Sequence, residues 1–144
     1  MANLTCRVLW WTLVASLVVY AVVAHVSGLP PSSNAQVALL APIFVALSVA
    51  IGIGTAVYRR RALAGPIQSG ELDPSTPEGL QAAFQPFIIN LVLSESVGIY
   101  GLVLAFLSGQ PMYSVAFSGA AIGLMYVHRP TAPDLQPPMS AHRP

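Results

Sequence analysis

Largely apolar residues fall in four segments, at about 8–28, 37–58, 87–107 and 112–127, separated by polar stretches. A helix that crosses the hydrocarbon core of a bilayer needs roughly 20 mostly apolar residues. The pattern therefore predicts an all-α, polytopic membrane protein with four transmembrane helices. The fourth segment is the shortest, and a re-entrant or interfacial segment is the alternative for it.

The composition agrees with a chain that lies mostly in lipid. Hydrophobic residues make up 55% of the chain and charged residues 8%, whereas a soluble domain has about 25% charged residues. The net charge of +1 gives no support for nucleic-acid binding. The single cysteine, Cys6, cannot form a disulfide within the chain. No set of nucleophile, base and orienting residue is evident, and the three histidines are not spaced for a metal, so we expect no catalytic site, cofactor or metal.

The arginines orient the predicted helices. The chain has six basic residues, all arginine: Arg7, Arg59, Arg60, Arg61, Arg129 and Arg143. The connections 29–36 and 108–111 carry no charge. Because positively charged connections stay in the cytoplasm, we expect both termini and the long loop 59–85 there. A cleaved signal peptide over residues 1–28 is the alternative for the first segment, and it leaves the later helices in the same orientation.

The long loop is predicted to divide in two. Residues 65–73 have the composition of an irregular segment, and a helix start follows. Either Thr76 caps a helix whose first residue is Pro77, or Ser75 and Glu78 form a capping box. This helix would continue into the third span with a kink at Pro86. The Pro-rich tail, 130–144, is predicted to be disordered.

Glu95 is the most informative residue because it lies near the middle of the third apolar segment. A carboxylate at the centre of a membrane helix costs roughly 2.5–3.5 kcal/mol and marks a functional site by default. No lysine or arginine lies inside a predicted span. We therefore expect Glu95 to be protonated or ion-bound when it faces lipid, and a cation that pairs with its charged form must come from another chain.

Small residues recur in the second and fourth segments. Such residues let the backbones of neighbouring membrane helices approach closely. The positions that we assign to helix packing are Ala46, Ser48, Ala50, Gly52, Gly54, Gly119 and Gly123.

The run from Leu93 to Val103, Leu-Ser-Glu-Ser-Val-Gly-Ile-Tyr-Gly-Leu-Val, resembles the outer helix of the c subunit (proteolipid) of rotary ATP synthases. The small-residue segment before it resembles the inner helix of that family, so the resemblance covers about 37–107. It implies that Glu95 binds the transported ion, that Tyr100 hydrogen-bonds the closed carboxyl, and that Ser96 and the Leu93 carbonyl complete the shell. The inner-helix glutamine of sodium-binding members has no counterpart here, which favours the proton.

The resemblance implies an ion-translocating subunit, with the proton favoured as its ion, in an oligomer with other membrane subunits and in contact with lipid in the bacterial inner membrane. Its implied mechanism is ion-driven rotation of a ring. The chain departs from the family in its long loop and its two additional spans. These departures favour the alternative of a non-catalytic accessory or assembly subunit of a larger membrane complex. A small transporter that works as an oligomer is a third hypothesis.

Overall fold

The computed structural model describes residues 4–28, 30, 35–73 and 76–129. All regular structure in these residues is helical, in the order α1 (Leu4–Val26), α2 (Ala35–Arg59), the π-helix η1 (Arg60–Ala64), α3 (Gly65–Ser69), α4 (Pro77–Ser108) and α5 (Met112–Val127). Three helices, α1, α4 and the continuous stretch Ala35–Ser69, are long and apolar enough to cross a membrane. With 16 residues, α5 is a shorter apolar helix. These helices indicate an integral membrane protein.

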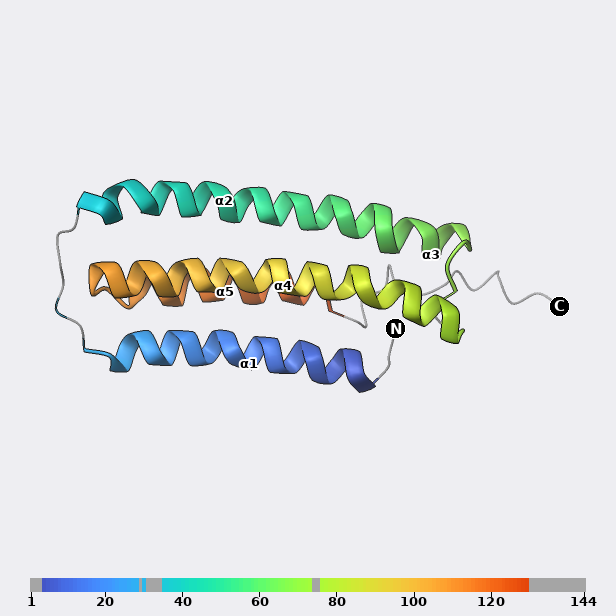
Figure 1. The fold of residues 1–144 in the computed structure, drawn as a ribbon, viewed down its shortest axis with the longest axis horizontal. Helices are drawn as coiled ribbons and strands as arrows, with labels where there is room; N and C mark the ends of the chain where they lie inside the picture. The colour runs from blue at the N-terminus through green and yellow to red at the C-terminus, as the bar shows by residue number, and fades with distance from the viewer. Residues whose placement is uncertain (1–3, 29, 31–34, 74–75, 130–144) are drawn as a thin grey trace.

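The bundle is organised around α4. In Figure 1, α1 and α2 lie on opposite sides of α4, and α5 runs alongside α4 behind it. Helix α4 contacts α1, α2 and α5. Within the most apolar window of each helix, 44% of α4 is buried, against 11% for α1 and 6% for the stretch that begins with α2. Helix α4 therefore provides the largest share of the core.

The start of α4 confirms the helix start that the sequence predicts. Thr76 is the N-cap, its hydroxyl accepts the Gly79 N–H at 3.1 Å, and Pro77 is the first helical residue. Proline suits this position because its missing N–H would have no partner in the first turn. The helix continues through Pro86 without a break, and the predicted kink there stays a prediction.

The prediction of an irregular segment over 65–73 is wrong in its first half. Helix α2 continues through the π-helix and through α3 as far as Ser69. The end comes at Gly70, whose φ of 79° lies in the left-handed region that glycine adopts readily. The predicted loop 59–85 is therefore helical at both of its ends. The tail 130–144 lies outside the described residues.

Two glycines of α4 allow the closest helix approaches in the bundle. A Cβ built on Gly101 would lie 2.4 Å from the Phe117 Cβ and 2.7 Å from the Tyr113 carbonyl oxygen, both on α5. A Cβ built on Gly98 would lie 2.2 Å from the Leu17 Cδ2 on α1. The contacts of Gly101 are with rigid atoms and require glycine, as expected where backbones pack closely in membranes. The Leu17 Cδ2 near Gly98 is the end of a flexible side chain, which can move aside.

The glycines assigned to packing from the sequence make no such approach to another of the described helices. A Cβ on Gly54, Gly119 or Gly123 would meet no atom within 4 Å, and one on Gly52 would make an ordinary contact of 3.5 Å with the Leu124 side chain. The other residues of α2 assigned to packing are also exposed or partly exposed: Ala46, Ser48 and Ala50. Packing of these positions against another chain stays a prediction.

Candidate functional site

Glu95 is partly buried on α4, and its carboxyl is hydrogen-bonded to two side chains of α1. The Ser16 hydroxyl lies 2.7 Å from the Glu95 Oε1, and the Tyr20 hydroxyl lies 3.0 Å from the same oxygen. Because residues four apart share one face of a helix, Ser16 and Tyr20 present their hydroxyls together toward α4. The carboxyl and the two hydroxyls form the candidate site.

The contacts of Ser16 limit how hydrogens can be arranged around the carboxyl. The Ser16 Oγ lies 2.7 Å from the Leu13 carbonyl oxygen as well as 2.7 Å from the Glu95 Oε1. A serine hydroxyl has a single hydrogen to donate, and a carbonyl oxygen only accepts. If Glu95 carries a proton on Oε1, the carboxyl donates to Ser16, Ser16 donates to the carbonyl, and Tyr20 donates to the carboxyl. If Glu95 is charged, Ser16 can serve only one of its two acceptors.

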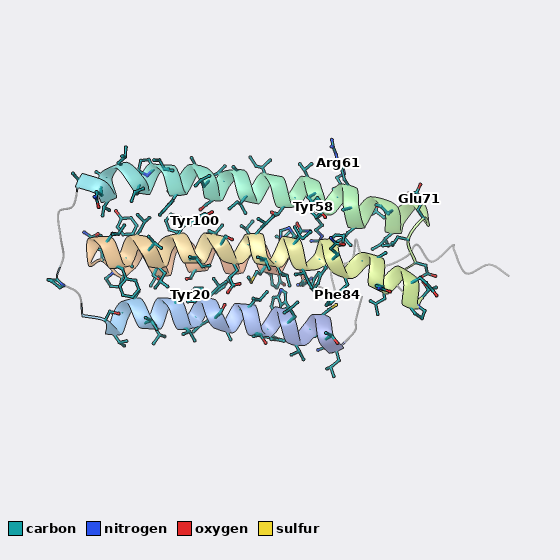
Figure 2. The ribbon with its side chains drawn as sticks, in the orientation of Figure 1. Tyr20, Tyr58, Arg61, Glu71, Phe84 and Tyr100 are labelled. Atoms are coloured by element: carbon teal, nitrogen blue, oxygen red, sulfur yellow. The ribbon has the colours of Figure 1, made fainter. Side chains whose placement is uncertain are left out.

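The shell implied by the family resemblance lies elsewhere. The Tyr100 ring stacks on Phe44 of α2, with ring centroids 4.9 Å apart and planes at 18°. Figure 2 labels Tyr20 between α4 and α1 and Tyr100 between α4 and α2, on opposite sides of α4. The Ser96 hydroxyl donates to the Val92 carbonyl at 3.1 Å. Within the described residues, neither Tyr100 nor Ser96 hydrogen-bonds Glu95.

Leu93 lies on α4 with its side chain exposed, and no described hydrogen bond joins its carbonyl to Glu95. The structure thus brings Glu95 together with Ser16 and Tyr20, which the sequence analysis missed. A signal for them exists in the sequence, because the two residues lie four apart in the first apolar segment, although Thr12, His25 and Ser27 are further polar residues there.

A second polar group fills the core at the end of the bundle where α5 ends. The Asn90 side-chain amide donates to the Pro86 carbonyl at 3.0 Å, and the Ser94 hydroxyl donates to the Asn90 carbonyl at 2.8 Å. The Ser94 Oγ also lies 3.3 Å from the His128 Nδ1. The three side chains Asn90, Ser94 and His128 are buried. These contacts connect α4 to the C-terminal end of α5.

No three His, Cys, Asp or Glu side chains converge on a metal position in the part of the chain that the structure describes. Comparisons with models of protein families, with curated protein sequences and with solved structures found no match. The candidate site is therefore defined by its own residues and their geometry.

Proposed function

We propose that this chain is an ion-translocating membrane subunit in which Glu95 carries the ion, most simply a proton. The observation that carries the proposal is the convergence of two hydroxyls of α1 on one carboxyl oxygen in an apolar helix. An ionisable side chain inside a membrane helix is rare and usually belongs to an ion path. Here the carboxyl also has two hydroxyl partners within its own chain.

The proton is the simpler ion for this site. The 2.7 Å between the Ser16 Oγ and the Glu95 Oε1 is a direct hydrogen-bond distance, so a hydrogen joins these two oxygens. The neutral acid avoids the roughly 2.5–3.5 kcal/mol that a carboxylate costs at the centre of a membrane helix. A basic side chain of a partner subunit would favour the charged form and so release the proton. Each proton that crosses the membrane supplies about 2.3 kcal/mol per 100 mV.

The proposed setting is a complex of several membrane subunits in the bacterial inner membrane, with four spans and both termini in the cytoplasm. The arginines support this orientation, because Arg7 lies in the first turn of α1, Arg59–Arg61 at the end of α2 and Arg129 just after α5, at the same end of the bundle (Figure 1). With 16 residues, α5 is about 24 Å long, shorter than the roughly 30 Å of hydrocarbon. Local thinning of the bilayer around α5 would allow it to span.

An accessory or assembly subunit is the second candidate, and one observation favours it. The two hydroxyls that bond Glu95 both belong to the same chain, so the carboxyl can serve as a fixed tie between α1 and α4. In that case Glu95 stays neutral and carries no ion. The apolar side chains that α2 exposes along its length would then face the neighbouring subunits of the complex.

Labelling of Glu95 by a hydrophobic carbodiimide separates the two functions. The full chain in lipid is labelled across a range of pH, with and without sodium, and the mass of the detergent-extracted assembly is measured. The ion carrier predicts labelling that increases as the pH falls, no protection by sodium, and a large oligomer. Glu95→Gln removes the labelled carboxyl, whereas Glu78→Gln, at the exposed start of α4, leaves the labelling unchanged.

If sodium protects Glu95 from labelling, Glu95 is an ion site and its ion is sodium rather than the proton. An unreactive Glu95 in an assembly with one copy of the chain would reject the ion carrier and support the accessory subunit.

A further inference from the structure

An apolar groove of about 560 Å³ lies between α2 and α5, which both pack against α4 (Figure 1). Its floor includes Val97, a buried side chain of α4. Small residues widen its walls, namely Ser48 and Gly52 on α2 and Ala120 and Gly123 on α5. A Cβ built on Gly123 would meet no atom within 4 Å, so the space beside this residue is open.

The lining of this groove offers a ligand little except hydrocarbon. Among the described residues that line it, Ser48 alone has a polar side chain. The Ser48 hydroxyl donates to the Phe44 carbonyl at 2.7 Å, so its hydrogen is used within α2. A polar group buried without a hydrogen-bond partner costs free energy. A ligand that fills this groove must therefore be apolar.

The length of the groove matches one leaflet of a bilayer. Along α5 its lining extends from Ala116 to Val127, which is about 17 Å at 1.5 Å per residue. Val127 is the last residue of α5, and Arg129 follows it closely. The hydrocarbon core of a bilayer is about 30 Å thick, so one leaflet contributes about 15 Å. The groove therefore extends from the arginine end of the bundle to about the middle of the bilayer.

The cross-section of the groove fits a slender chain rather than a helix. A helix with its side chains is about 10–12 Å wide, so a 17 Å length of it fills roughly 1,300–1,900 Å³. The groove has less than half of this volume. It is also narrow at Gly52, where an added Cβ would lie 3.5 Å from the Leu124 Cδ2 of α5. A helix of another chain can lie across the rim, but it cannot enter the groove.

We propose that the groove binds one acyl chain of a phospholipid from the leaflet at the arginine end of the bundle. The acyl chain enters beside Val127 and lies along α5 toward Ala116. Inside a bilayer the gain in free energy comes from close packing, because the surrounding lipid is equally apolar. A groove contacts an acyl chain on several sides, whereas the outer face of a single helix contacts it on one.

The proposal does not depend on ion transport, because neither Glu95 nor its partners Ser16 and Tyr20 line the groove. It does compete with the prediction that Ser48, Gly52 and Gly123 pack against a helix of another chain. One experiment can distinguish the two occupants.

The test is photolabelling of the full chain in vesicles of phosphatidylethanolamine and phosphatidylglycerol. A small fraction of the phospholipid carries a diazirine at a defined carbon of one acyl chain, and mass spectrometry of peptides locates the labels. We expect the labels on α2 and α5 to gather at the groove, rather than at Leu39 and Ile53, which are exposed but do not line it. A diazirine near the glycerol should label close to Val127, and one near the end of the acyl chain should label close to Ala116.

Gly123→Leu fills the groove from α5 and should remove most of this labelling. Gly119→Leu is the matched control, because Gly119 lies on the same helix and is also exposed, but does not line the groove. A Cβ at either position would meet no atom within 4 Å, and leucine favours a helix over glycine. Both variants should therefore fold, and Gly119→Leu should leave the labelling of the groove unchanged.

Uniform labelling of the exposed faces of α2 and α5 would overturn the proposal, as would equal losses in the two leucine variants. Either result would describe the lipid that surrounds any membrane helix. Disulfide-linked dimers of Ala120→Cys, made in a chain that also carries Cys6→Ala, would show a second copy over the groove and would overturn it as well. Labelling that follows the depth of the diazirine, without such dimers, would support an acyl chain in the groove.

Discussion

Replacing Gly101 with alanine should loosen the interface between α4 and α5. The added Cβ would lie 2.4 Å from the Phe117 Cβ and 2.7 Å from the Tyr113 carbonyl oxygen. Neither atom can rotate away, because one belongs to the backbone and the other is attached directly to it. An ordinary contact begins at 3.4 Å, so the two helices must move apart by about 1 Å.

The magnitude follows from two opposing effects. Forcing an additional carbon into a well-packed interface costs about 1–3 kcal/mol. Alanine in place of glycine inside a helix gains about 0.5–1 kcal/mol. Because the blocking atoms are rigid, we expect the upper part of the packing range for Gly101→Ala and a net destabilisation of about 2 kcal/mol.

Gly119→Ala is the matched control, since a Cβ there would meet no atom within 4 Å. It should leave the stability unchanged or raise it by up to about 1 kcal/mol. The assay is unfolding of the purified protein in mixed micelles with increasing sodium dodecyl sulfate, followed by tryptophan fluorescence. Equal effects of the two substitutions would refute the packing of α4 against α5 described above.

Three further predictions concern the helix contacts. Gly98→Ala should destabilise less than Gly101→Ala, because its Cβ meets the flexible end of the Leu17 side chain at 2.2 Å. Adding Leu17→Ala to Gly98→Ala should recover part of the lost stability. If the losses of the two single variants simply add in the double variant in the unfolding assay, this contact is contradicted. Trp10→Phe removes the indole N–H that donates to an α5 carbonyl at 2.8 Å and should cost about 1 kcal/mol, whereas Trp11→Phe, at an exposed residue, should cost little. Thr76→Ala removes the cap of α4 and should cost about 1 kcal/mol, with faster amide hydrogen exchange confined to the first turn of α4.

The helices and one cap were accessible from the sequence because their causes are local. A long apolar segment forms a helix in lipid, since every backbone polar group must be satisfied within it. The start at Thr76 follows from a capping residue beside a proline. Residues 65–69 were mispredicted because a Gly-Pro pair normally marks a loop. Here a π-helical turn accommodates Gly65 and Pro66 and lets the helix continue.

The hydroxyl shell of Glu95 was not accessible from its own segment. The position of a residue on α4, such as Tyr100, follows from its place in the sequence. The side chains that it contacts depend on which helix packs against its side of α4. Helix α1 packs against the Glu95 side of α4 and α2 against the Tyr100 side. That choice depends on contacts between residues far apart in sequence, including Gly98 with Leu17. The periodicity of one apolar segment does not determine it.

Infrared difference spectroscopy of the protein in lipid is the most direct test of a proton site at Glu95. The carbonyl stretch of a neutral carboxylic acid is compared at acidic and alkaline pH in the unmodified protein and in Glu95→Gln. If Glu95 carries a proton, we expect a carboxylic acid band that is lost reversibly as the pH rises and that is missing from Glu95→Gln. The band should shift in frequency in Tyr20→Phe, which lacks one of the bonds to Oε1. A band that is the same in Glu95→Gln, or a Glu95 carboxyl that never changes its protonation state, would contradict it.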